Sequence, residues 1–176
     1  MTISTGTEIT VNGNMYLGEP NDSYDKGTLI NNGKLTVTGS LELRNDGNIE
    51  NNAELIIEKK LWNSGTLYGR KPTIKNNGIL RTNDCDIADY KLSYIANDDS
   101  ELYISGNVTS DHWAGNNAFG GTIIFNGTET QSVSRLNSTH IVDVQNKNGL
   151  KYKGDIHISG YYKLNGNPLA LNGYTT

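Results

Sequence analysis

Three consecutive residues, Asp111, His112 and Trp113, have the side chains best suited to holding a ligand in this sequence. A tryptophan face can stack on a sugar ring, while histidine and aspartate hydrogen-bond to its hydroxyl groups. The surrounding stretch is polar and rich in Gly and Asn, and a loop of this kind on a rigid scaffold is a common place for binding. We therefore expect a ligand-binding site here. The alternative is that Trp113 folds down and covers an end or edge of the protein.

A group of aspartates raises two further hypotheses about chemistry. Several carboxylate oxygens could together bind Ca²⁺, although the spacing differs from that of a dedicated Asp-x-Asp-x-Asp-Gly loop. Two close carboxylates could instead act as acid and base in polysaccharide cleavage. Solvated turns explain the same residues, so the sequence leaves calcium binding open, and we expect no cofactor. The aspartates are Asp84, Asp86, Asp89, Asp98, Asp99 and Asp111.

Other residues with reactive or aromatic side chains indicate structural roles. The sequence has no Gly-x-Ser-x-Gly nucleophile elbow, and its single cysteine, Cys85, excludes a disulfide framework and a multi-thiolate metal site. Burial as a small hydrophobe is the commoner role of such a cysteine. We expect Trp62 to pack, and His157 to face solvent because it alternates with two isoleucines. The sequence therefore predicts a protein that is not an enzyme.

The elements that must position these residues follow from an unusual composition. The 176 residues include 20 Gly and 24 Asn, a quarter of the chain, and 35% are hydrophobic. Gly and Asn accept turn conformations readily. The apolar residues gather in short alternating runs between these turns, such as Leu35-Thr36-Val37 and Leu102-Tyr103-Ile104. Alternation over short windows is typical of strands, so we expect an all-β protein.

Charge and hydropathy exclude two classes of partner. The chain has 15 Lys and Arg against 19 Asp and Glu, a formal net charge of −4. A nucleic-acid binder needs a cationic face, and no apolar run approaches the roughly 20 residues that cross a bilayer. We therefore expect neither nucleic acid binding nor membrane insertion.

A recurring Asn-x-small tripeptide suggests how the strands are arranged. An aliphatic residue follows each small residue by two positions, which predicts a unit of turn, polar residue and inward aliphatic residue. Equivalent turns that stack would let asparagine amides hydrogen-bond from one coil to the next, and neighbouring units combine into coils of roughly 20 to 27 residues. This pattern favours a β-solenoid over a sandwich or meander of hairpins. The tripeptides are Asn31-Asn32-Gly33, Asn45-Asp46-Gly47, Asn51-Asn52-Ala53, Asn63-Ser64-Gly65 and Asn76-Asn77-Gly78; the aliphatic residues are Leu35, Ile49, Leu55, Leu67 and Leu80.

The most specific prediction is a right-handed parallel β-helix that forms a single elongated domain over residues 1–176. We expect an entry or cap segment at 1–28, regular coils at 29–82, irregular coils with loops at 83–120 and further coils at 121–176. No Pro-rich or Gly/Ser-rich linker separates these parts. The first residues lack a signal peptide, and we interpret the chain as a piece of a longer protein.

Residues 121–173 resemble modules of large repetitive bacterial surface proteins, the adhesin-like and filamentous β-solenoid exoproteins. The segments that carry the resemblance are Gly121-Thr122-Ile123-Ile124-Phe125-Asn126-Gly127, Gln131-Ser132-Val133, Val142-Asp143-Val144-Gln145-Asn146, Gly149-Leu150 and Asp155-Ile156-His157-Ile158-Ser159-Gly160. The resemblance implies a structural or adhesive module at a bacterial cell surface or outside the cell. It transfers no catalytic residue.

These observations leave three functions to compare. The first is a non-enzymatic stalk or adhesive surface, with host or environmental glycans or surface proteins as partners. The second is a glycan-binding or fibre-like recognition module, and the third is a polysaccharide-active β-helix enzyme. Solenoid ends need capping, so we also expect end-to-end self-association of an excised module.

Overall fold

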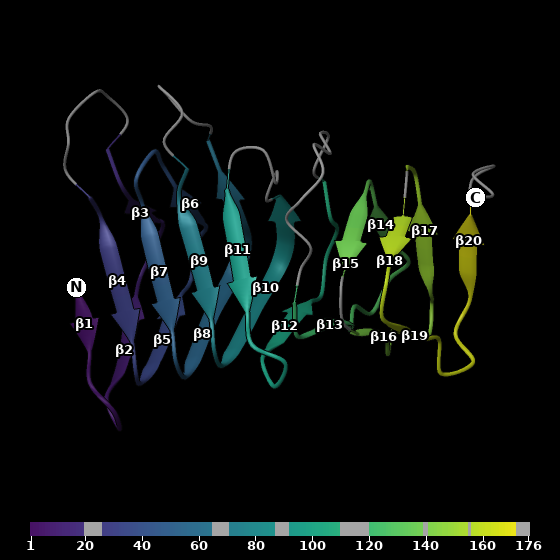
Figure 1. Cartoon of the computed structure of the whole chain (residues 1–176), viewed down its shortest axis with the longest axis horizontal. Helices are drawn as coiled ribbons and strands as arrows, with labels where there is room; N and C mark the ends of the chain where they lie inside the picture. The colour runs from purple at the N-terminus through teal and green to yellow at the C-terminus, as the bar shows by residue number, and fades with distance from the viewer. Residues whose placement is uncertain are drawn as a thin grey trace.

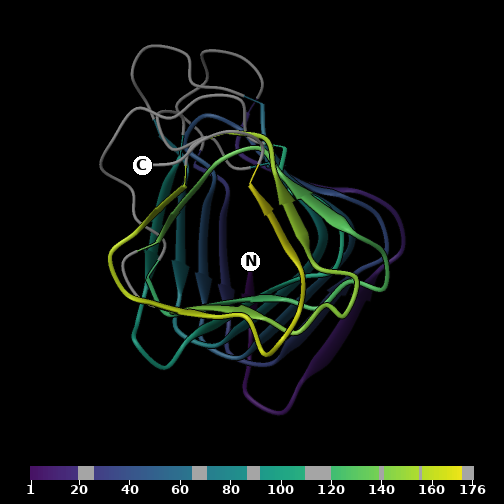
Figure 2. The same cartoon turned by 90° about the vertical axis from the view of Figure 1, so that its right-hand side faces the viewer.

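The structure, a computed structural model, describes residues 1–19, 26–64, 71–86, 92–109, 120–138, 141–154 and 156–171. Short strands stack along one axis, with the first and last coils at opposite ends (Figure 1). The described residues contain no helix, and every strand pair among them is parallel. Seen along the axis, the chain coils in the right-handed sense (Figure 2). The predicted all-β, right-handed parallel β-helix in one elongated domain is confirmed.

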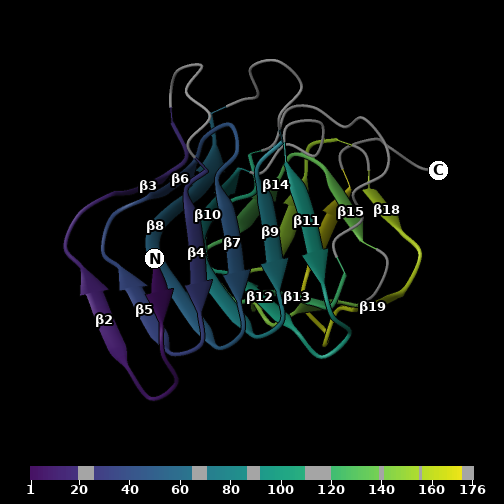
Figure 3. The ribbon, with the colours of Figure 1, turned by 60° about the vertical axis from the view of Figure 1, so that its left-hand side comes forward.

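Each coil contributes strands to three faces in turn (Figure 3). The first face consists of β1 (Thr2–Ile3), β4 (Thr28–Asn31), β7 (Asn48–Asn51), β9 (Thr73–Asn76) and β11 (Ser93–Ala96). In the later coils β15 (Leu136–Ser138) and β18 (Ile156–Ile158) occupy the corresponding place in chain order, and they pair with each other.

The second face is the longest continuous ladder. Its members are β2 (Glu8–Val11), β5 (Lys34–Val37), β8 (Glu54–Asn63), β10 (Ile79–Asp86), β12 (Glu101–Ile104), β13 (Thr122–Phe125), β16 (Ile141–Val144) and β19 (Tyr161–Lys163). The third face consists of β3 (Met15–Leu17), β6 (Leu41–Leu43), the second halves of β8 and β10, an isolated bridge at Val108, β14 (Gln131–Val133), β17 (Leu150–Tyr152) and β20 (Leu169–Leu171).

Inward side chains line up in columns, because each residue pairs with its equivalent in the next coil. On the second face one column contains Ile9, Leu35, Leu55, Leu80, Leu102, Ile123, Val142 and Tyr162. Successive members are 19 to 26 residues apart, close to the predicted coil length. All six members between the first and the last are at most 2% exposed. Stacking therefore buries a continuous core that no single coil could form.

A buried ladder of asparagines occupies the corner between the first and second faces. Asn31 Nδ2 donates to Asn51 Oδ1 at 2.8 Å, and Asn51 Nδ2 donates to Asn76 Oδ1 at 2.8 Å. The same amides also donate to backbone carbonyls of the next coil, at Glu54 and Ile79. All three asparagines are fully buried, so the ladder satisfies polar groups inside the core.

The next residue of each tripeptide forms a second, outer ladder. Asn52 Nδ2 donates to Asn32 Oδ1 at 2.9 Å, and Asn77 Nδ2 donates to Asn52 Oδ1 at 2.7 Å. The third position is tight, because a Cβ at Gly78 would overlap the carbonyl oxygen of Ala53 in the coil before it. The predicted amide ladders are thus confirmed at this corner.

The sequence suggested that the five tripeptides mark equivalent turns. The structure shows that they do not. Those beginning at Asn31, Asn51 and Asn76 stack at one corner. Asn45 instead follows the third face and adopts a left-handed conformation with φ of 30°. Asn63 ends β8 on that same face, where it pairs in register with Leu43. The Asn-x-small tripeptide therefore occurs at two different corners of the coil, and the repeating unit is the whole coil.

Candidate functional site

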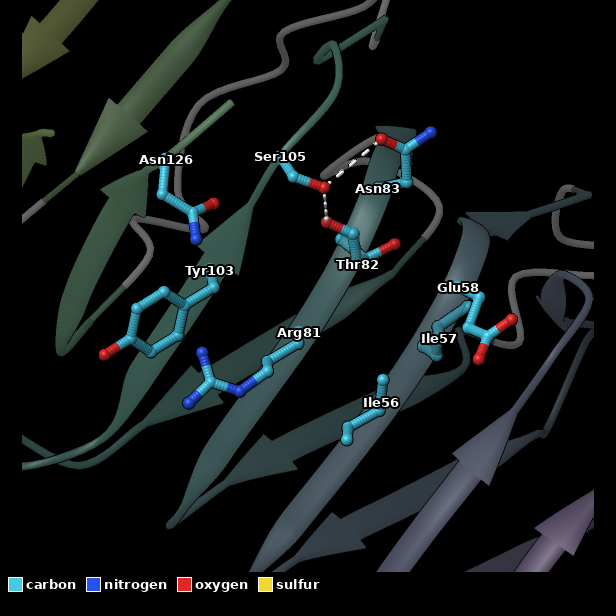
Figure 4. Close-up of a pocket in the computed structure, with 9 residues that line it drawn as sticks. All are labelled: Ile56, Ile57, Glu58, Arg81, Thr82, Asn83, Tyr103, Ser105 and Asn126. Carbon is cyan, nitrogen blue, oxygen red and sulfur yellow. Dashed lines mark hydrogen bonds between the residues drawn. The ribbon is translucent and has the colours of Figure 1, made fainter. Parts of the chain in front are cut away.

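A shallow groove of about 180 Å³ lies on the outer side of the second face. One wall is formed by Arg81 on β10 and Tyr103 on β12, and Ile56 on β8 continues the same row (Figure 4). These three residues are register partners on consecutive strands. They face outward because Leu55, Leu80 and Leu102, their neighbours in sequence, point into the core.

The Arg81 and Tyr103 wall is held by its own contacts. The Arg81 guanidinium lies 4.0 Å from the centroid of the Tyr103 ring, a distance at which a cation is attracted to the aromatic face. Arg81 Nε donates to Glu54 Oε1 at 3.1 Å, and Tyr103 OH donates to Glu101 Oε2 at 3.0 Å. Partial burial, followed by the hydrogen bond and charge of Glu101, raises the pKa of Tyr103. The tyrosine therefore remains a neutral hydroxyl at physiological pH.

Polar side chains at the corner form the rest of the groove. Ser105 Oγ donates to Asn83 Oδ1 at 3.2 Å, which fixes these two side chains relative to each other. Glu58 and Asn126 also line the groove, on opposite sides of it (Figure 4). Within the described part of the chain, the side chains of Glu58 and Asn126 have no hydrogen-bond or ion-pair partner, so both can bond to a ligand.

The groove offers binding groups without a catalytic pair. Glu58 is the one carboxylate among the described residues that line it, whereas glycoside hydrolysis uses two. Apolar and aromatic side chains with a few polar groups around them are the usual composition of a small-molecule site. The arrangement can hold a ligand by packing and hydrogen bonding.

A second cluster of charged and aromatic residues lies on the outer side of the third face. Arg44 makes a two-point contact with Glu42, Nε to Oε1 at 2.8 Å and Nη2 to Oε2 at 3.2 Å. The same guanidinium lies 4.3 Å from the centroid of the Tyr16 ring. Trp62 is the register partner of Glu42 on the other side, half-buried, with Lys60 Nζ 5.7 Å from its ring. Trp62 therefore packs on the outer surface of the third face.

Glu42 is an ionised carboxylate held in a nearly buried position. Burial alone would raise its pKa, but the hydrogen bonds from Arg44 and Ser64 and the charge of Arg44 outweigh burial. The pKa of Glu42 therefore lies below its ordinary value of 4.5. A carboxyl group with a lower pKa in the folded than in the unfolded state stabilises the fold while it is ionised.

This ion pair predicts an acid-dependent part of the stability. We expect Glu42→Gln to lower the free energy of unfolding at pH 7. The difference from the parent should shrink as the pH falls below 4.5 and through the folded-state pKa of Glu42. Urea unfolding from pH 7 to pH 3 measures it, with the exposed Glu8→Gln as control. A gap that stays constant with pH would contradict the assignment.

Of the residues singled out from the sequence, those within the described ranges do not line the groove. Asp111, His112 and Trp113, together with Asp89, lie outside the described residues. Asp86 pairs with Lys60 at 2.7 Å, and Asp84 Oδ1 accepts the backbone N–H of Asn107 at 2.7 Å. Among the residues that the structure describes, no three His, Cys, Asp or Glu side chains lie together as a metal site.

Two other expectations about single residues are confirmed. Cys85 is 1% exposed and lies in the inward column of the third face. His157 is exposed on β18, between two partly buried isoleucines.

The comparisons with known proteins add no assignment. Neither the protein-family models, nor the curated proteins, nor the solved structures contain a match to this chain. Over the described ranges, no helix is both long and apolar enough to span a membrane.

Sequence reasoning missed the groove because its residues are far apart in the chain. Arg81 and Tyr103 are 22 residues apart and become neighbours only through the pairing of β10 with β12. The sequence did contain a signal for the pair, since Arg81 and Tyr103 each follow a buried leucine at the same position of their strands. Finding the pair requires the coil length, which varies from one coil to the next.

Proposed function

We propose that this chain is a non-enzymatic structural and adhesive module of a bacterial surface or secreted protein. The observation that carries the proposal is the unbroken inward column from Ile9 to Tyr162. A stack of coils stabilised by nearest neighbours extends in one direction and presents its outer faces to solvent. This geometry suits a stiff stalk that holds a binding surface away from its attachment.

The chemistry of the outer surface supports binding more than catalysis. The groove contains a stacked cation and aromatic ring, and Glu58 is the single carboxylate among its described residues. The resemblance of residues 121–173 to repetitive exoprotein modules supports a location at the cell surface or outside the cell. Glycans or surface proteins are the proposed partners.

The first and last coils support the proposed end-to-end association. Ile9 and Val11 at one end, and Tyr162 and Leu164 at the other, belong to the core but remain partly exposed. Inner coils cover the equivalent positions on both sides, as Leu35 and Val37 are fully buried. A second copy stacked on an end would cover these side chains.

The scaffold role is tested by measuring stiffness directly. Dyes are attached at the exposed positions Ser4 and Lys163, near the two ends, as cysteines in a Cys85→Ala background. We expect a single narrow distance distribution by single-molecule energy transfer that persists until unfolding. A broad distribution, or interconversion of compact and extended forms, would overturn the scaffold role. Catalysed release of reducing ends from a polysaccharide panel would overturn the non-enzymatic assignment.

A further inference from the structure

We propose that the groove on the second face binds one residue of a neutral saccharide. The ring would lie against the row of Ile56, Arg81 and Tyr103, with its hydroxyl groups bonded to Glu58, Asn83 and Asn126 on the other side. The inference names a ligand class for the proposed adhesive role and rests on it. It is independent of the stiffness measurement, so the two proposals can fail separately.

The unoccupied hydrogen-bonding capacity of the groove points to hydroxyl groups. Glu58 can only accept hydrogen bonds, whereas the Asn126 amide both donates and accepts. A sugar hydroxyl also donates and accepts, so adjacent hydroxyls can satisfy both kinds of partner. Asn83 Oδ1 already accepts from Ser105 at 3.2 Å, so the Asn83 side chain is positioned with its amide nitrogen as a donor.

The charges around the groove select a neutral ligand. The Glu54 carboxylate contacts two cations, Arg81 Nε at 3.1 Å and Lys34 Nζ at 3.6 Å, so Glu54 and Glu58 together balance their charges. Glu58 adds a negative charge on the opposite side from Tyr103 (Figure 4). An anionic ligand such as a phosphate or a uronic acid would meet the Glu58 carboxylate at close range. A neutral sugar avoids this repulsion and can use the same carboxylate as an acceptor.

The size and openness of the groove set the length of ligand that it holds. The groove has a volume of about 180 Å³. This is enough for part of one sugar ring, with the remainder in solvent. The row of Ile56, Arg81 and Tyr103 spans three strands, and adjacent strands are about 4.8 Å apart. Further sugar residues of a chain would therefore extend along the outer face rather than into the core.

The test is binding of the folded chain to an array of neutral and acidic oligosaccharides, followed by titration of the strongest neutral ligand. We expect Tyr103→Ala to weaken binding about tenfold, because the wall loses its ring. Tyr103→Phe keeps the ring and should retain most of the affinity. Asn126→Ala should weaken binding severalfold without changing unfolding, because this side chain has no partner among the described residues.

The matched control is Tyr16→Ala. This ring also stacks with an arginine, Arg44 at 4.3 Å, and is half exposed, but it does not line the groove. We expect Tyr16→Ala to bind normally, and chemical-shift changes of labelled protein to centre on Ser105 and Asn126. The proposal is overturned if no neutral saccharide binds, if acidic ligands bind in preference, or if Trp113→Ala abolishes binding while Tyr103→Ala leaves it intact.

Discussion

Replacing Leu55 with alanine is expected to lower the free energy of unfolding by about 2–5 kcal/mol. Leu55 is fully buried, and its register partners Leu35 and Leu80 cover it on both sides. Truncation removes apolar area and leaves a cavity that the two neighbouring coils cannot close without moving their own strands. Urea or guanidinium unfolding followed by circular dichroism measures the loss.

The adjacent residue provides the control for this change. Ile56 is on the same strand but points outward and lines the groove, where it is partly exposed. We expect Ile56→Ala to cost less than half as much as Leu55→Ala, because less apolar surface leaves water when Ile56 folds. If both variants lost the same free energy of unfolding, Leu55 would not face the core and Ile56 would not face solvent as the structure has them.

Asn51→Ala is expected to lower the free energy of unfolding by about 3 kcal/mol. Asn51 is the middle member of the buried ladder and bonds to Asn31 and Asn76 at 2.8 Å each. Without its amide, Asn76 Oδ1 and the carbonyl oxygen of Ile79 lose a donor. Buried polar atoms left without a partner cost more than the net value of the bonds themselves.

The outer ladder allows the effect of burial to be separated from that of the bonds. Asn52 takes part in two similar amide contacts, at 2.9 and 2.7 Å, but it is exposed. Water can replace those contacts, so Asn52→Ala should cost less than 1 kcal/mol. If both alanine variants lost the same stability, burial of the inner ladder would not be the cause of its contribution.

The fold could be predicted because its main features repeat within the sequence itself. Alternation identified the strands, and Asn-x-small turns predicted both stacking and the amide ladders. The inward residues Leu35, Ile49, Leu55 and Leu80 are buried as expected, whereas Leu67 lies outside the described residues. Each of these inferences depends on a residue and its close neighbours in the chain.

The order of the corners could not be predicted in the same way. The tripeptides at Asn31, Asn45 and Asn51 have the same residue pattern, yet Asn45 belongs to a different corner with a left-handed backbone. Asparagine accepts both left-handed and ordinary turn conformations, so its presence alone does not distinguish the two corners. The distinction depends on which strand each corner follows.

The groove was hidden for a related reason. Arg81, Tyr103 and Glu58 have ordinary surface side chains when considered separately, and only strand pairing brings them together. The sequence instead drew attention to consecutive residues, Asp111 to Trp113, because adjacency is visible without a structure. Binding surfaces on stacked strands combine one residue from each coil, at intervals set by the whole coil.

Unequal coil lengths have a consequence for how this chain can vary. Register partners on the second face are 19 residues apart at Ile123 and Val142, but 26 apart at Ile9 and Leu35. The added residues are accommodated between strands, where lengthening a surface loop has a small entropic cost. Insertions and deletions at these connections should therefore be tolerated during evolution. The same connections are suitable places to graft a foreign epitope.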